Sequence, residues 1–79
     1  MLSKPDNAEQ KNIAGVAVHR YREKFSLSQQ ALVDLLNDRG ISMTSSTISK
    51  IENGKRGIND YELFALAEIY GVSVDDMFR

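Results

Sequence analysis

The 79 residues carry ten Lys and Arg against eleven Asp and Glu, a net charge of −1, and 42% of them are apolar. This length and composition support one small domain with a limited core. The chain has no cysteine and a single histidine, His19, which excludes a disulfide framework and argues against a zinc site, so we expect no metal and no other cofactor. No apolar run reaches the length of a membrane span or a signal-peptide core, so we expect a cytoplasmic protein with no membrane partner.

The first eleven residues differ from the rest of the chain in composition. Residues 1–11 are mostly polar and contain the only proline, Pro5. We predict a flexible N-terminal segment here and a folded domain at residues 12–79. The spacing Asp6-x-x-Glu9 leaves open an earlier helix start through a capping box.

Two amphipathic helices are predicted next. The first covers residues 13–24, with Gly15 as a local weak point. The second begins after Ser28, a favourable N-cap, and ends in the polar run at residues 37–40. Apolar residues recur at helical spacing in both. The expected inward positions are Ile13, Ala17, Val18 and Tyr21 in the first helix and Ala31, Leu32, Leu35 and Leu36 in the second.

Residues 41–44 connect to a third helix. Ile41 and Met43 are expected to hold this connection against the core, and Thr44 is a good N-cap for a helix at residues 45–53. The Asn-Gly pair at residues 53–54 predicts its end, because glycine takes the left-handed conformation of a helix stop.

This third helix has two unlike faces. Ile48, Ile51 and Glu52 fall at i, i+3 and i+4 and share one face. The other face is small and polar, with Ser46, Ser49, Lys50 and Asn53. Such a face could enter a nucleic-acid groove, with cations just beyond it, but a short polar face is equally often only solvated.

Two further helices complete the prediction. Asn59-x-x-Glu62 is a capping box for a fourth helix, with Gly71 as its stop, and Ser73-x-x-Asp76 starts a short fifth one. The expected inward residues are Leu63, Leu66, Ala67 and Tyr70, followed by Val74, Met77 and Phe78. No sustained period-two run indicates a strand. The predicted fold class is therefore all-α, with five short helices around one core.

The charge is unevenly distributed. Residues 1–38 are balanced, residues 39–57 carry four cations against one carboxylate, and residues 58–79 carry one cation against five carboxylates. The only positive segment is the one with the two-faced helix. An acidic C-terminal third is expected to lie away from phosphates.

At this point the chain resembles the Cro/C1-type helix-turn-helix family, also called the XRE family. The matching segments are Leu27-Ser28-Gln29, Leu32, the run TISKIENGKR at residues 47–56, and GVSVDDMF at residues 71–78. The resemblance implies a compact five-helix lambda-repressor-like domain. It also implies that the helix at residues 28–38 lies across a DNA backbone while the helix at residues 45–53 enters the major groove.

The resemblance implies roles for individual residues. The positions matching Ser45, Ser46, Ser49 and Lys50 would face base edges. Gln29 in the first turn of its helix, together with Asn53, Lys55 and Arg56, would hold the DNA backbone. For Lys50 a phosphate contact or free solvent is the alternative, and for the serines much of the specificity could come from DNA shape.

One feature departs from the family pattern. The connection at residues 37–44 is about five residues longer than the usual turn, so either the second helix extends or a loop projects near the DNA. Arg39 could then touch a phosphate, although a solvated loop charge is the preferred interpretation.

The inner face of the third helix contains a carboxylate that needs a partner. Burying Glu52 unpaired among isoleucines would be costly, and Arg22 is the natural candidate, a pairing that the resemblance also implies. His19 is expected on the solvated side of the first helix, without partners for catalysis.

The sequence-based hypothesis is a sequence-specific DNA-binding transcriptional regulator, a repressor that binds double-stranded DNA as a homodimer and has no evident small-molecule ligand. Met77 and Phe78, with Val72 or Val74, are predicted to contribute to the dimer contact, unless Phe78 closes the core of its own protomer. The alternative is a protein-interaction module such as an antitoxin-like partner-binding component. No catalytic constellation is present, so we expect no enzymatic activity.

Overall fold

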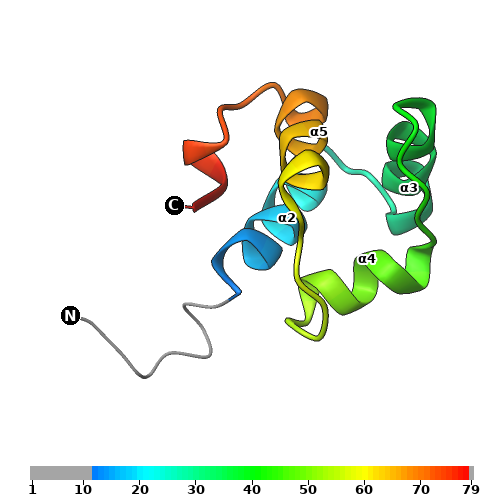
Figure 1. The fold of residues 1–79 in the computed structure, drawn as a ribbon, viewed down its shortest axis with the longest axis horizontal. Coiled ribbons are helices and arrows are strands. Elements are labelled where there is room, and N and C mark those ends of the chain that lie inside the picture. Colours follow the sequence, from blue (N-terminus) through cyan, green and yellow to red (C-terminus); the bar gives the residue numbers. More distant parts are fainter. Residues whose placement is uncertain (1–11, 79) are drawn as a thin grey trace.

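The computed structural model describes residues 12–78, which fold into four α-helices and one 3₁₀ turn (Figure 1). In chain order the elements are α2 (Ile13–Lys24), α3 (Gln29–Asp38), α4 (Ser45–Glu52), α5 (Asp60–Tyr70) and η1 (Asp75–Phe78). No strand occurs within this described part, so the predicted all-α class is confirmed. The segment at residues 1–11, predicted to be flexible, lies outside the described residues.

The prediction of a fifth α-helix was wrong. Ser73 and Asp76 do cap each other, with both reciprocal hydrogen bonds at 3.1 Å, but the element they start is the single 3₁₀ turn η1. The Met77 N–H donates to the Val74 carbonyl at 3.0 Å, the i→i+3 spacing of the tighter helix. This turn places Met77 in the core with no exposed surface, so Met77 cannot supply the predicted dimer contact.

The predicted helix starts are confirmed. The hydroxyl of Ser28 accepts from the Ala31 N–H at 3.0 Å, and the hydroxyl of Thr44 accepts from the Thr47 N–H at 3.3 Å. The capping box at the start of α5 is complete, and Gly71 ends that helix in the left-handed conformation, with φ 69°. Each start satisfies backbone donors that a helix terminus otherwise leaves free.

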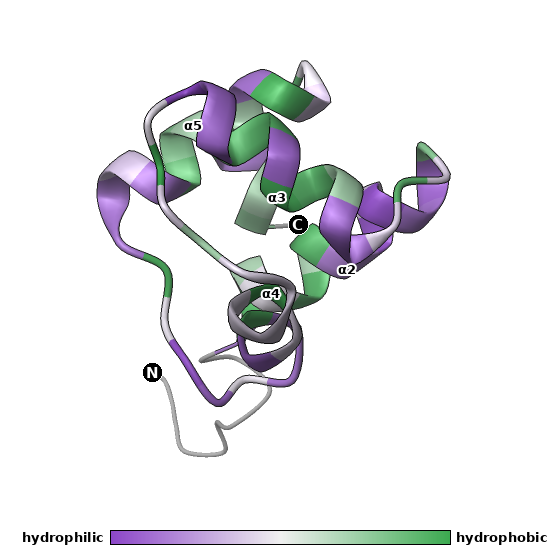
Figure 2. Cartoon of the chain, turned by 90° about the vertical axis from the view of Figure 1, so that its right-hand side faces the viewer, coloured by the Kyte–Doolittle hydropathy of each residue, from purple (hydrophilic) through white to green (hydrophobic). Residues whose placement is uncertain are grey.

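The core is built from every element. Its fully buried large side chains are Leu32, Leu36, Ile48, Ile51, Leu66, Met77, Val18 and Val33. Hydrophobic residues collect where the helices face one another (Figure 2). Val33 was missed by the sequence analysis, whereas several predicted inward residues pack only partly buried at the edge: Ile13, Tyr21, Ala31, Leu35, Leu63 and Val74. Phe78, also predicted inward, is 51% exposed.

Helix α2 touches α4 at a glycine. A methyl group on Gly15 would overlap the backbone carbonyl oxygen of Ile51 and the side chain of Asn12. Asn12, the N-cap residue of α2, donates its side-chain amide to the Glu52 carbonyl at 3.3 Å. Gly15 is therefore not merely a weak point in α2, because it permits the close approach that holds the end of α4.

The connection from α3 to α4 packs against the core instead of projecting. Ile41 and Met43 are 8% and 7% exposed, as predicted, and the Met43 N–H donates to the Asn37 side-chain oxygen at 3.4 Å. Arg39 lies beside Glu68 of α5, with Nε 3.7 Å from the carboxylate. Both side chains are well exposed, which agrees with the preferred interpretation of Arg39 as a solvated loop charge.

Candidate nucleic-acid interface

Helix α4 exposes the small polar face that the sequence predicts. Ile48 and Ile51 are fully buried, whereas Ser46, Lys50 and Asn53 are exposed. Ser45 and Ser49 lie at the flanks, half-buried, and the Asn53 amide donates to the Ser49 hydroxyl at 3.5 Å. Apart from Lys50, the side chains named on this face are short, so within the described residues the outer side of α4 can approach the edge of a base pair.

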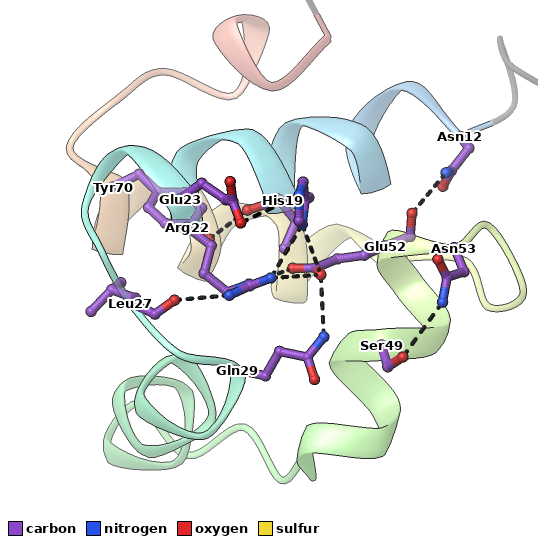
Figure 3. Close-up of polar contacts among 11 residues, drawn as sticks. Asn12, His19, Arg22, Glu23, Leu27, Gln29, Ser49, Glu52, Asn53 and Tyr70 are labelled. Atoms are coloured by element: carbon purple, nitrogen blue, oxygen red, sulfur yellow. Dashed lines mark hydrogen bonds and ion pairs between the residues drawn. The ribbon is translucent and has the colours of Figure 1, made fainter.

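The inner edge of α4 is held by the predicted ion pair. Arg22 of α2 donates from Nε and Nη2 to the two carboxylate oxygens of Glu52, at 2.8 and 3.1 Å (Figure 3). The side chains are 13% and 7% exposed. Arg22 also donates from Nη1 to the Leu27 carbonyl at 2.9 Å, so one guanidinium fixes α2, the connection to α3 and α4 together.

The electrostatics keep Glu52 ionised. Burial alone would raise the pKa of this carboxyl, but hydrogen bonds from Arg22, His19 and Gln29 outweigh it, and the pKa of Glu52 is lowered. The same hydrogen bond raises the pKa of Arg22 despite its desolvation. The pair therefore remains charged at neutral pH.

Gln29 begins α3 and turns its side chain toward this pair. Its amide Nε2 donates to Glu52 Oε1 at 3.3 Å. This hydrogen bond ties the start of α3 to the end of α4. A protein that inserts one helix into a DNA groove must hold that helix in a fixed position, and this contact contributes to it. The DNA-backbone contact predicted for Gln29 would come in addition.

His19 joins the same cluster, which the sequence analysis did not foresee. Its ring is half exposed, as expected, but Nδ1 lies 3.2 Å from Glu52 Oε1 and 3.1 Å from Arg22 Nη2. His19 and Arg22 are three residues apart on one helix face. The three-residue spacing in the sequence could therefore have predicted that His19, like Arg22, lies beside Glu52.

The two cations after α4 have different surroundings. Gly54 adopts φ 76°, which reverses the chain after the helix, and Lys55 is exposed. Arg56 instead donates from Nη1 and Nη2 to the two oxygens of Glu62, both at 3.0 Å. Lys55 has the setting expected of a phosphate contact, whereas the guanidinium of Arg56 already has a carboxylate partner.

Several of these residues surround one shallow depression of about 360 Å³. It is lined by Val16, His19, Arg22, Gln29, Glu52 and Asn53. Gln29 from α3 and Asn53 at the end of α4 thus line the same depression, and Figure 3 shows both beside Glu52 or its helix end. Within residues 12–78, no three metal-ligating side chains form a cluster.

A family model described as helix-turn-helix matches residues 18–77. The chain belongs to the Cro/C1-type helix-turn-helix family. This membership makes the protein a DNA-binding regulator of that type. Searches of curated proteins and of solved structures found no match.

The helix-turn-helix domain has no helix among its described residues that is long and apolar enough to cross a bilayer.

Proposed function

We propose that this helix-turn-helix protein is a sequence-specific transcriptional repressor that inserts α4 into the major groove as a homodimer. The observation that carries the proposal is the exposed polar face of α4, Ser46 and Lys50 above all, on a helix whose opposite side is locked by the Arg22–Glu52 pair. A rigidly held helix with small polar side chains outward suits direct contact with base edges.

The proposed roles separate reading from positioning. Lys50 has the reach to donate to guanine O6 and N7, and Ser45, Ser46 and Ser49 supply short donors and acceptors around it. Gln29, Asn53 and Lys55 would contact the sugar-phosphate backbone, which sets the register without reading sequence. Arg56 contributes less directly, since its guanidinium is occupied by Glu62.

The dimer proposal rests on exposed apolar surface and on the small size of one module. Phe78 of η1 remains 51% exposed, and Tyr61 and Phe64 of α5 are 63% and 58% exposed. A single domain makes few contacts to DNA, and two copies reading half-sites about 34 Å apart are the usual solution for helix-turn-helix proteins. Such a pairing would act by blocking a promoter.

The direct test is selection of bound duplexes from a random pool, followed by footprinting of the selected site. A two-fold symmetric footprint with half-sites one helical turn apart is the expected result. Enrichment of no sequence over the starting pool would contradict sequence-specific binding. Placing the selected site across a promoter in a transcription assay then distinguishes repression from activation.

Assembly is tested separately by sedimentation of the wild type and Phe78→Ser, alone and with the selected duplex. We expect a wild-type dimer on DNA and weaker pairing in the variant. A folded wild type that stays monomeric at high micromolar concentration, with and without DNA, contradicts the dimer.

The exposed aromatic residues of α5 favour one alternative, an antitoxin-like component whose main task is to bind another protein. Tyr61 and Phe64 are followed by acidic residues on the same segment, a surface suited to a protein with basic and apolar character. The test is the double variant Lys50→Ala, Lys55→Ala, which is expected to lose its DNA affinity. If this variant still binds its cellular partner and keeps its activity in cells, the result supports the alternative over repression.

A further inference from the structure

His19 occupies a position that the helix-turn-helix assignment does not explain. Its ring lines the depression shared by Gln29 and Asn53, the two residues proposed to contact the DNA backbone from α3 and α4. Figure 3 shows the imidazole on the same side of the molecule as both of these amides. The histidine side chain is 50% exposed, so a ligand at this surface can reach it.

The charge of the depression depends on this one ring. Among the lining residues, Arg22 and Glu52 neutralise each other at 2.8 Å, and Gln29, Asn53 and Val16 are uncharged. Protonation of His19 therefore changes the lining from neutral to a net charge of +1. Imidazole is the side chain that makes this change between pH 5 and 8.

The neighbouring charged groups determine which nitrogen is available. On α2 these are Arg22, whose Nη2 lies 3.1 Å from Nδ1, and Glu23, whose Oε2 lies 3.7 Å from Nε2. On α4 the charged neighbour is Glu52, with Oε1 3.2 Å from Nδ1, and α3 contributes only the neutral Gln29. A neutral ring can accept from Arg22 through Nδ1, whereas a protonated ring donates from Nδ1 to Glu52.

With Nδ1 donating to Glu52, Nε2–H is the donor left for another acceptor, on a half-exposed ring that lines the depression. Among residues 12–78, the carboxylate beside Nε2 is that of Glu23, which at 3.7 Å is within ion-pair range but beyond hydrogen-bond distance, and it is 65% exposed. A phosphate oxygen seated between Gln29 and Asn53 could accept from this N–H in its place. A charge-assisted hydrogen bond of this kind is stronger than one from a neutral donor.

We propose that protonated His19 is a further DNA-phosphate contact, so that affinity for duplex DNA rises as the pH falls from 8 to 6. This inference rests on the proposed function, since it places the DNA backbone over the ends of α3 and α4. The contact reads no base, so it strengthens specific and non-specific duplexes alike.

The experiment measures the dissociation constants of the selected duplex and of a scrambled duplex at pH 6 and pH 8, each at several salt concentrations. It compares the wild type, His19→Gln, which is neutral throughout, and His19→Lys, which is charged throughout. Because His19 is the only histidine and the chain has no cysteine, no other side chain is expected to change charge in this window. The α-amino group also titrates near this pH range, and because it is unchanged in His19→Gln, that variant shows how much of any pH dependence it causes.

For the wild type we expect binding to be roughly two- to five-fold tighter per protomer at pH 6, the range for one partly exposed charge pair. The slope of log K against log salt should be steeper at pH 6 by up to about 0.9 per contact. His19→Gln should show the pH 8 affinity and slope at both pH values, and His19→Lys should show values near those of the wild type at pH 6. A purely structural role in supporting Glu52 would leave the salt slope unchanged.

Two outcomes would overturn the proposal while leaving the DNA-binding function intact. One is wild-type binding with the same affinity and salt slope at both pH values. The other is a pH dependence that persists in His19→Gln. If the folded wild type binds neither duplex at any pH, the proposed function itself fails, and this contact fails with it.

Discussion

Arg56 and Glu62 fasten the turn after α4 to the start of α5 through two parallel hydrogen bonds of 3.0 Å. The Glu62 side chain is 4% exposed, and its Oε1 also accepts from the Asn59 N–H at 3.1 Å, which completes the capping box. The hydrogen bond from Arg56 is the largest reason why the pKa of Glu62 is lowered, and it outweighs the effect of burial. A carboxylate this buried depends on its cation.

We therefore expect Arg56 and Lys55 to respond differently to substitution. Arg56→Ala should lower the free energy of unfolding by about 1–3 kcal/mol, because it leaves a buried acceptor without its partner. Lys55→Ala should barely change stability but should flatten the slope of log K against log salt by about 0.9. Denaturant titration and salt-dependent DNA binding measure the two effects. An equal loss of salt slope in Arg56→Ala, with unchanged stability, would show that Arg56 contacts a phosphate after all.

The Arg22–Glu52 pair should contribute more to stability than the surface pair between Arg39 and Glu68. Arg22→Ala strands a carboxylate that is 7% exposed, for an expected loss of about 3–5 kcal/mol. Arg39→Ala breaks a 3.7 Å contact between exposed side chains and should cost at most about 1 kcal/mol. Urea denaturation of both variants makes the comparison. Similar losses of unfolding free energy in Arg22→Ala and Arg39→Ala would mean that the Arg22–Glu52 pair is solvated.

Substitution of Gly15 should destabilise the fold although alanine is the better helix former. Intrinsic propensity favours Gly15→Ala by up to about 1 kcal/mol. The added methyl group would overlap the Ile51 carbonyl, a backbone atom that cannot move without displacing α4, and we expect a net loss of about 1–3 kcal/mol. Gly57→Ala is the matched control, since nothing lies within 4 Å and the φ of Gly57 is not positive. A more stable Gly15→Ala variant would refute the close approach.

Lys50 should read a base, whereas Lys55 should not. Lys50→Ala is expected to cost about 1–3 kcal/mol on the preferred duplex and to relax the choice at one base pair, with much less effect on a scrambled duplex. Lys55→Ala should weaken both duplexes alike. Titration of both variants against both duplexes separates these roles. An equal loss on the two duplexes in Lys50→Ala would reduce Lys50 to a phosphate contact.

Acid should weaken the fold through Glu52. A carboxyl whose pKa is lower in the folded state contributes stability above the ordinary glutamate range, and this contribution is lost as the pH falls through the lowered value. We expect the free energy of unfolding to be level from pH 7 to about 5 and to fall below that. Glu52→Gln should be less stable at pH 7, with a gap to the wild type that narrows in acid. A gap that is constant from pH 7 to pH 3 would contradict this linkage.

Local chemistry was sufficient to predict the four α-helices and the residues that cap them, but not that the last element would be a single 3₁₀ turn. Ser28, Thr44, Asn59 and Gly71 act on backbone groups within a few residues, so their roles follow from the sequence without knowledge of the fold. The need for a partner of Glu52 could also be predicted, because a carboxylate among isoleucines needs a cation, and the family resemblance implied that this cation is Arg22.

Contacts between distant segments needed the tertiary structure. That Gly15 meets Ile51, that His19 joins the Arg22–Glu52 pair, and that Arg56 is occupied by Glu62 depend on how helices pack. The sequence determined the all-α class and the two-faced character of α4, because periodicity and capping are local. Only the packing decided which cations remain free for DNA, since a side chain within reach of two partners pairs with the carboxylate that the fold places beside it.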